Sequence, residues 1–229
     1  KSVPAVYKIF GPGNQYVTAA KMYANRLGIA IDMPAGPSEV AIFANETANP
    51  EFIASDLLSQ AEHGHDSQVV LVSTSEKILN QSIQAIISQL ETLPRKDFAE
   101  SSLKNSQFIL INSNDEAIEL LNEYGAEHLI LACDEAEEMA NSITNAGSIF
   151  LGHYTPESAG DYASGTNHTL PTNGFAKAYS GVNLDSFVKK ITLQAISKKG
   201  LQNIGPSVIT MAEAESLQAH ANAVKIRLT

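Results

Sequence analysis

The sequence has few cysteines, few basic residues and few long apolar runs, and each shortage excludes a class of protein. Cys133 is the single cysteine, which excludes a disulfide within the chain and fits a reducing cytoplasm. The chain has 15 Lys and Arg residues against 25 Asp and Glu residues. The resulting net charge of −10 argues against nucleic-acid binding, because phosphates need a basic surface. No apolar stretch approaches the roughly 20 residues of a membrane span, and the start shows no signal-peptide pattern.

What the sequence does contain indicates a globular protein with a substantial core. Of its 229 residues, 44% are hydrophobic and 17% are charged, which allows one large domain or two small ones. Cys133 ends the apolar run Leu129–Cys133, where a buried and inert thiol is expected. The chain starts at Lys1 and reaches the turn Gly11-Pro-Gly-Asn14 almost at once, where Asn14 can cap the helix that follows. Because a nucleotide-type loop normally follows a strand inside a larger sheet, this start is abrupt for a complete protein.

Predicted strands alternate with predicted helices over the first two thirds of the chain. The apolar runs predict strands at residues 6–10, 28–33, 40–43, 68–73, 107–112, 128–132 and 148–151. Helical spacing predicts helices at residues 15–27, 50–63, 76–91, 114–124 and 134–145. This alternation predicts an α/β fold with a parallel or mixed sheet flanked by helices, as in an incomplete Rossmann-like domain. Ligands of such sheets gather near loop ends at the switch points.

The pattern changes after Gly152. Residues 152–182 are rich in glycine and have only short apolar runs, and a loop of that length in a compact domain is usually functional. Pro206 and Ser207 precede a predicted helix over residues 211–227, which makes a small helical C-terminal tail. We therefore predict three parts, namely a remnant of a nucleotide-binding domain (1–38), a main α/β domain (39–182) and the tail (183–229).

Gln60 and His63 are the first candidate functional residues. They are three apart at the end of the helix predicted over residues 50–63, so they share a face, and Gly64 then stops the helix. An oxygen donor with an imidazole suits zinc or a neighbouring transition metal. The same pair taken alone is more often ordinary surface.

Three further segments carry groups that could take part in catalysis or binding. Glu127 and His128 place a carboxylate beside an imidazole at a strand edge, and together they could serve as an acid–base pair. Asp161 lies among small residues that allow a ligand to approach, in the stretch that runs on to His168. Glu215 and His220 lie five apart in the predicted C-terminal helix. Each motif by itself is also compatible with a purely structural or solvated role.

Taken together and in this order, the motifs resemble histidinol dehydrogenase. The resemblance runs from Lys8 to about Arg227 and rests on D-M-P-A-G-P-S-E (32–39), S-Q-A-E-H-G (59–64), E-H-L (127–129) and G-D-Y-A-S-G-T-N-H (160–168), with F-G-P-G-N at 10–14. The family implies oxidation of L-histidinol to L-histidine through the aldehyde, with two NAD molecules and one zinc ion. It also implies a homodimer in which the C-terminal tail crosses to the partner's site, and the single cysteine fits a cytoplasmic location.

The resemblance assigns roles to individual residues. It implies Gln60, His63, Asp161 and His220 as zinc ligands. It implies Glu127 and His128 as the catalytic acid–base pair, and Asn14 as a contact of NAD. It implies substrate contacts at Ser38, His128, Asp161, His168, Glu215 and His220.

One departure from the family and three alternatives remain open at this stage. Family members run to well over four hundred residues, so this chain matches only the C-terminal part and is expected to be inactive alone. The first alternative is a zinc- and NAD-dependent relative that oxidises another small alcohol. The second is a non-catalytic zinc-binding module that only dimerises. A hydrolase is the third, and the glycine-rich turn with its strand–helix units favours a dinucleotide over it.

Overall fold

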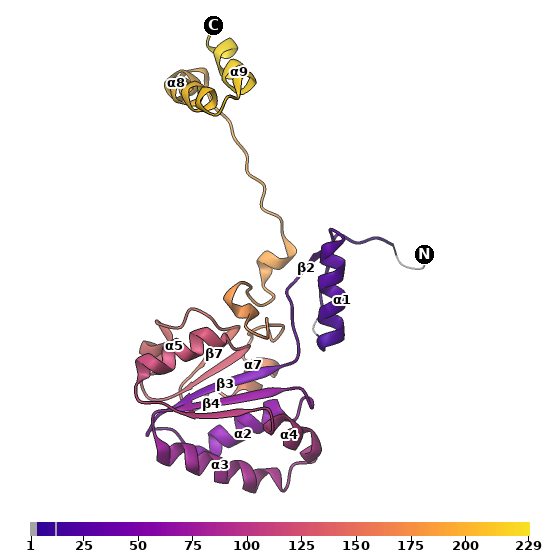
Figure 1. Cartoon of the computed structure of the whole chain (residues 1–229), viewed down its shortest axis with the longest axis vertical. Helices are drawn as coiled ribbons and strands as arrows, with labels where there is room; N and C mark the ends of the chain where they lie inside the picture. The colour runs from indigo at the N-terminus through magenta and orange to yellow at the C-terminus, as the bar shows by residue number, and fades with distance from the viewer. Residues whose placement is uncertain (1–3, 12) are drawn as a thin grey trace. The chain divides into compact units, whose positions relative to one another are not determined.

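The computed structural model describes residues 4–11 and 13–229, and the chain divides into two compact units (Figure 1). The first unit ends at Phe187 and the second is Val188–Thr229. Pro12 of the predicted turn and residues 1–3 of the predicted 1–38 domain lie outside the described residues. The three-part division stays a prediction.

A parallel sheet of five strands forms the centre of the first unit. The strands are β5 (Gln107–Leu110), β4 (Gln68–Ser73), β3 (Glu39–Ala44), β6 (His128–Ala132) and β7 (Ser148–Leu151), in that order across the sheet. Every neighbouring pair is parallel, which confirms the α/β prediction in its parallel form. The chain enters this sheet at β3, adds β4 and β5 on one side and then returns to add β6 and β7 on the other. The topological switch point therefore lies between β3 and β6.

Helices cover both faces of this sheet. Helices α2 (Pro50–Ala61), α3 (Glu76–Leu90) and α4 (Lys96–Leu103) pack on one face, and α5 (Asn114–Tyr124) and α6 (Ala136–Ala140) pack on the other (Figure 1). Successive strand residues point to opposite faces, so Val40 and Ile42 join the first core while Ala41 and Phe43 join the second. The strands are apolar on both sides, as sheets buried on both faces require. Cys133 is buried in the second core, and burial raises the pKa of its thiol to about 11, which fits an inert thiol.

Local signals fix where the helices begin and end. Asn49 and Ser113 cap α2 and α5 with side-chain oxygens that accept backbone N–H groups. Gly125, with a φ of 64°, ends α5 in the left-handed conformation and turns the chain into Glu127 and β6.

Two of the helices that flank this sheet differ from the prediction. The prediction lacked α4, which fills the connection to β5. The helix predicted over residues 134–145 is wrong beyond Ala140, because α6 stops there. The side chain of Asn122 accepts hydrogen bonds from Thr144 N (2.7 Å) and Asn145 N (3.2 Å), so these groups are not available to a longer helix.

The segment predicted as a long loop contains a short helix, α7 (Glu157–Tyr162). Gly160 lets this helix approach Phe150 of β7, since a Cβ atom there would lie 2.6 Å from the ring. Two single turns follow, η1 (Phe175–Lys177) and η2 (Leu184–Phe187).

The residues before β3 form a small β–α–β element. Strand β1 (Lys8–Ile9) pairs in parallel with β2 (Ala30–Ile31), and α1 (Gln15–Arg26) connects them. Both strands are shorter than predicted. Lys21 of α1 forms a buried ion pair with Asp32 and donates to the carbonyl of Gly11 at 2.8 Å, which ties the helix to both ends of the element.

The second unit is a pair of helices, α8 (Lys198–Ala214) and α9 (Gln218–Leu228). The small helical tail is confirmed, but the single helix predicted over residues 211–227 is wrong. Helix α8 continues through Pro206, and the break comes at Ser216, whose φ of 61° ends the first helix. Within the described part of the chain, no helix has both the length and the apolar character needed to cross a membrane.

Candidate active site

A pocket of about 240 Å³ opens where the amino ends of β3 and β6 meet the ends of α2 and α7. Its lining residues come from segments spread over more than one hundred and fifty positions of the chain. They are Gly13, Ala35, Gly36, Ser38, Gln60, His63, Glu127, His128, Glu157, Asp161, Tyr162, His168, Thr169 and Leu170.

The topology explains why these segments meet. Parallel strands have their amino ends at one edge of the sheet, so Ser38 before β3 and Glu127 before β6 lie side by side. Helix α2 leaves the carboxyl end of β3 and runs back, which returns Gln60 and His63 to the same edge. The pocket is thus at the switch point, but at the edge opposite the usual ligand crevice. The carboxyl-end edge instead carries Asp134, 3.0 Å from His153, and Glu135, and this negative charge does not suit a phosphate.

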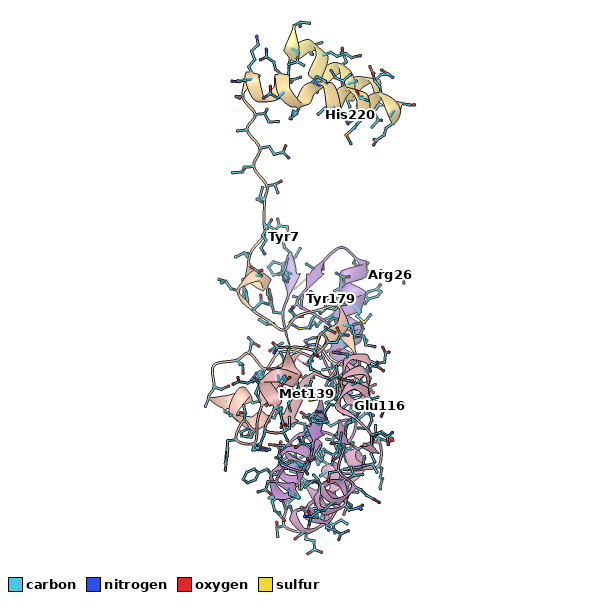
Figure 2. The ribbon with its side chains drawn as sticks, turned by 90° about the vertical axis from the view of Figure 1, so that its left-hand side faces the viewer. Tyr7, Arg26, Glu116, Met139, Tyr179 and His220 are labelled. Atoms are coloured by element: carbon cyan, nitrogen blue, oxygen red, sulfur yellow. The ribbon has the colours of Figure 1, made fainter. Side chains whose placement is uncertain are left out.

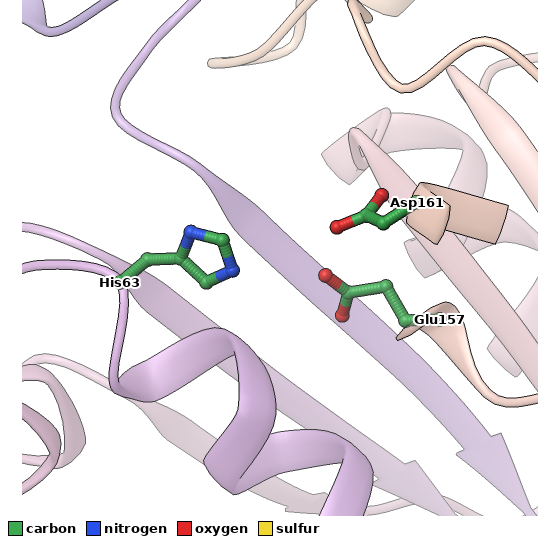
Figure 3. Close-up of side chains that lie close together, drawn as sticks. All are labelled: His63, Glu157 and Asp161. Atoms are coloured by element: carbon green, nitrogen blue, oxygen red, sulfur yellow. The ribbon is translucent and has the colours of Figure 1, made fainter. Parts of the chain in front are cut away.

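Three side chains in the pocket could hold a metal ion. Ligand atoms of His63, Glu157 and Asp161 all lie within 4.8 Å of one another, and the side chains point toward one another (Figure 3). Gln60 lines the same pocket, and both polar atoms of its fully buried side chain lack a hydrogen-bond partner among the described residues. Asp161 Oδ1 and Glu157 Oε2 are buried in the same unpartnered way. Since buried polar atoms are nearly always satisfied, this donor set fits a divalent cation.

Glu157 is a site residue that the sequence reasoning missed. It is 2% exposed and lies one helical turn before Asp161 on α7, so the two carboxyl groups share a face. The i, i+4 spacing of Glu157 and Asp161 was a usable signal. The spacing has meaning only on a helix, and residues 152–182 carry the composition of a loop.

His128 lies at the centre of a ring of carboxyl groups. Its Nε2 atom is 3.7 Å from Asp161 Oδ1, and its Nδ1 atom is 3.8 Å from both Glu127 Oε2 and Glu157 Oε1. Neither ring nitrogen has a hydrogen bond from the described residues, although the side chain is only 5% exposed. A buried imidazole that is surrounded by carboxyl groups can accept a proton and pass it on.

The acids of the pocket differ in the direction of their pKa shifts, which is downward for Asp161 and upward for Glu127 and Glu157. The nearby imidazole of His128 lowers the pKa of Asp161, against the effect of burial, so this carboxyl is charged and suited to a cation. Burial raises the pKa of Glu157 well above its usual value, and the neighbouring acids add to the rise. Burial likewise raises the pKa of Glu127 to about 8, and its carboxylate neighbours Glu39 and Asp161 contribute. Glu127 is therefore a stronger base than an ordinary glutamate.

The other predicted residues of the first unit lie in or beside the pocket. Ser38 and His168 line it, and the Nδ1 atom of His168 lies 3.2 Å from the carbonyl oxygen of Asp161. Asn14 is not a lining residue. It caps α1 as predicted, because its Oδ1 atom accepts hydrogen bonds from Tyr16 N and Val17 N, while the adjacent Gly13 reaches the pocket.

Glu215 and His220 belong to the second unit. Glu215 caps the carboxyl end of α8, and His220 lies on α9 beyond the break (Figure 2). Both side chains are exposed. The expectation that they share one helix is wrong because Ser216 separates the two helices. Their roles as a substrate contact and a metal ligand stay predictions.

Comparison with known proteins assigns the whole chain to one group of relatives. A family model described as histidinol dehydrogenase matches residues 1–228. A histidinol dehydrogenase of Bacteroides fragilis (strain YCH46) is 60% identical over 228 residues, which are 100% of this chain and 53% of the relative. The chloroplastic histidinol dehydrogenase of Arabidopsis thaliana is 55% identical over 230 residues, which cover 99% of this chain and 49% of the relative. The chain thus spans about half the length of the curated relatives it matches.

Solved structures agree with the sequence comparison. The crystal structure of histidinol dehydrogenase from Elizabethkingia anophelis superposes with a TM-score of 0.95 at 59% identity, covering 100% of this chain and 53% of that one. The crystal structure of gamma-glutamyl phosphate reductase from Thermotoga maritima gives a TM-score of 0.52 at 12% identity, over 83% of this chain and 53% of that one. The second likeness extends to the fold alone.

Proposed function

This chain belongs to the histidinol dehydrogenase family, and on that premise we propose that it oxidises L-histidinol to L-histidine through the aldehyde, with two NAD molecules and one zinc ion. The observation that carries the proposal is the convergence of Gln60, His63, Asp161 and the Glu127–His128 pair on a single pocket. These residues come from three separate motifs of the sequence, at 59–64, 127–129 and 160–168. The proposed setting is a cytoplasmic homodimer.

Gln60, His63 and Asp161 are the proposed zinc ligands within this unit. The unpartnered amide of Gln60 and the unpartnered oxygen of Asp161 support this assignment. With one carboxylate and neutral partners the loaded site stays positive, which suits a substrate that brings amine and imidazole nitrogens. A zinc ion bound there supplies a Lewis-acidic anchor for those nitrogens. The pocket residues then fix the alcohol carbon in a single orientation.

His128 and Glu127 are the proposed proton-transfer groups. In the first oxidation His128 takes the hydroxyl proton as the alcohol becomes an aldehyde. In the second, Glu127 removes a proton from the water that adds to the aldehyde, and the hydrate becomes the acid. The raised pKa of Glu127, about 8, supports its role as the base. When bound, NAD would supply the two-electron oxidant that each of these oxidations needs.

The remaining proposed contacts concern cofactor, substrate and partner. Asn14 is the proposed contact of NAD, and its side-chain oxygen caps α1. Ser38 and His168, both on the pocket wall, contact the substrate. Glu215 and His220 complete the site of the partner subunit, with His220 as the fourth zinc ligand.

The test uses this chain joined to the part of the Bacteroides fragilis relative that the match leaves uncovered. Two NADH per histidinol consumed is the expected result, with no NADH from the 229-residue chain alone. His128→Asn should slow both oxidations, whereas Glu127→Gln should mainly slow oxidation of added histidinal. A completed chain that binds zinc without forming NADH from histidinol would sink the proposal. Turnover of another small alcohol instead would point to a relative with a different substrate.

A further inference from the structure

Glu39 and Glu127 form a reciprocal pair at the amino ends of two neighbouring strands. The backbone N–H of Glu39 donates to Glu127 Oε2 at 3.0 Å, and the backbone N–H of Glu127 donates to Glu39 Oε1 at 3.3 Å. Both residues are 5% exposed. The ladder between β3 and β6 begins at the next position, with Val40 opposite His128. Each carboxyl group therefore fixes the backbone from which the other side chain projects.

The two acids differ in what else they face. Glu127 lines the pocket and Glu39 does not. Glu39 instead accepts a hydrogen bond from the backbone N–H of Asn173 at 3.0 Å, and the Asn173 side chain in turn donates to the carbonyl of Gly36 at 3.1 Å. Glu39 thus joins β3, β6 and the loop at residues 172–174 behind the pocket wall.

The pair also carries an electrostatic coupling. Burial raises the pKa of Glu39 to about 7, although the backbone N–H groups of Asn173 and Glu127 act to lower it. The titratable groups that face Glu127 are Glu39 from β3, His128 from β6, Tyr124 from α5, and Glu157 and Asp161 from α7. Two neighbouring buried carboxyl groups hinder each other's ionisation, and each makes the other a stronger base.

From this geometry, and resting on the proposed function, we infer that Glu39 is a positioning residue for the aldehyde oxidation and acts entirely through Glu127. Its N–H holds one oxygen of Glu127, which leaves the second oxygen as the acceptor for the attacking water. Its carboxyl group anchors the Glu127 backbone and keeps a negative neighbour beside the base. Glu39 itself does not touch the substrate.

The test compares wild type with Glu39→Gln in the completed chain described above. The amide keeps the size and one acceptor oxygen but removes the charge. We expect the apparent pKa of kcat for histidinal oxidation to fall by on the order of one unit, with the KM for histidinal within about twofold of wild type. Glu119→Gln, an exposed acid on α5, serves as the control and should leave the profile unchanged.

Glu39→Asp separates positioning from charge if the amide variant folds poorly. It retains the charge but is one methylene too short to hold Glu127, so it should lower kcat for the aldehyde about tenfold or more without moving KM. Suppose that the wild type is active. An unmoved pH profile in Glu39→Gln, or an unchanged kcat in Glu39→Asp, would then overturn this inference and leave the proposed function intact. A wild type inactive on both histidinol and histidinal would overturn the proposed function and the inference with it.

Discussion

His128 Nε2 and Asp161 Oδ1 lie 3.7 Å apart, which joins the proposed base to a proposed metal ligand. The other ring nitrogen of His128 is 3.8 Å from both Glu127 and Glu157, so the imidazole couples three carboxyl groups. Groups in a single network of this kind do not contribute independently. Substitutions at these acids should therefore be non-additive.

The first prediction concerns Glu157. Its buried carboxyl lies within 4.8 Å of the His63 and Asp161 ligand atoms, so Glu157→Gln should weaken zinc binding by about 10- to 100-fold, as loss of a group supporting a metal site does. Asp161→Asn should cost at least as much. Calorimetric titration of the metal-free chain with zinc measures both. Glu119→Gln is the matched control, and an unchanged affinity in Glu157→Gln would remove Glu157 from the metal site.

The second prediction concerns the pH dependence of stability at Asp56 of α2. Burial raises the pKa of this carboxyl from 3.8 to about 7. Between these two pKa values the folded chain retains a proton that the unfolded chain releases. The contribution of Asp56 to the free energy of unfolding is therefore fully present below about pH 4 and is lost as pH rises through about 7. The slope for one group is at most about 1.4 kcal/mol per pH unit.

Asp56→Asn has no titrating carboxyl at this position, so the contribution of Asp56 to the pH dependence of the free energy of unfolding should be absent. It should match wild type at about pH 4 and exceed its stability at about pH 8. Urea unfolding midpoints of metal-free protein across this range measure the difference. Curves that stay parallel to wild type would contradict the prediction, and Glu119→Gln should give such parallel curves.

The sheet could be predicted from the sequence because each strand carries its own signal. Buried parallel strands are continuous apolar runs, and residues 128–132 and 148–151 were bounded correctly as β6 and β7. The ends of α6 and α8 could not be predicted, because they depend on Asn122 reaching a distant loop and on the left-handed backbone of Ser216. These are tertiary or conformational choices that helical periodicity does not encode.

The site divides in the same way. Gln60 and His63 could be found from their helical spacing, and Glu127 and His128 from their adjacency. Glu39 could not, because its contact with Glu127 spans 88 positions and depends on the register of β3 against β6. A shift of one residue in that register would send each side chain to the opposite face.

The third prediction tests how tightly the Glu127 backbone is held. A Cβ atom on Gly147 would lie 2.5 Å from the carbonyl oxygen of Glu127, which also accepts a hydrogen bond from Ser148 N at 2.9 Å. Because backbone must move, Gly147→Ala should destabilise the fold by on the order of 1–3 kcal/mol. Thermal and urea unfolding measure the loss. Gly11→Ala is the control, since its Cβ would meet nothing within 4 Å, and equal losses in both variants would contradict the prediction.

The last prediction concerns the ion pair that holds the β1–α1–β2 element. The Lys21 and Asp32 side chains are 4% and 0% exposed, and Asp32 also accepts hydrogen bonds from Gly11 N at 2.8 Å and Met33 N at 2.7 Å. Burial acts to raise the pKa of Asp32, but Lys21 and these N–H groups outweigh it and lower the pKa below its usual value. Lys21→Met leaves that carboxylate buried without its cation, at a cost on the order of 3–5 kcal/mol.

Hydrogen exchange locates this cost. Lys21→Met should speed exchange of the Ala30 and Asp32 amides, which donate to Tyr7 and Ile9 across the two strands, and should leave the β3–β6 amides protected. The exposed Lys104→Met is the control. Because the pKa of Asp32 is lower in the folded than in the unfolded chain, its stabilising contribution is present above the unfolded pKa and is lost as pH falls. The difference in stability between Lys21→Met and wild type should therefore shrink below about pH 4. Wild-type exchange rates at Ala30 in Lys21→Met would show that the pair does not hold the element.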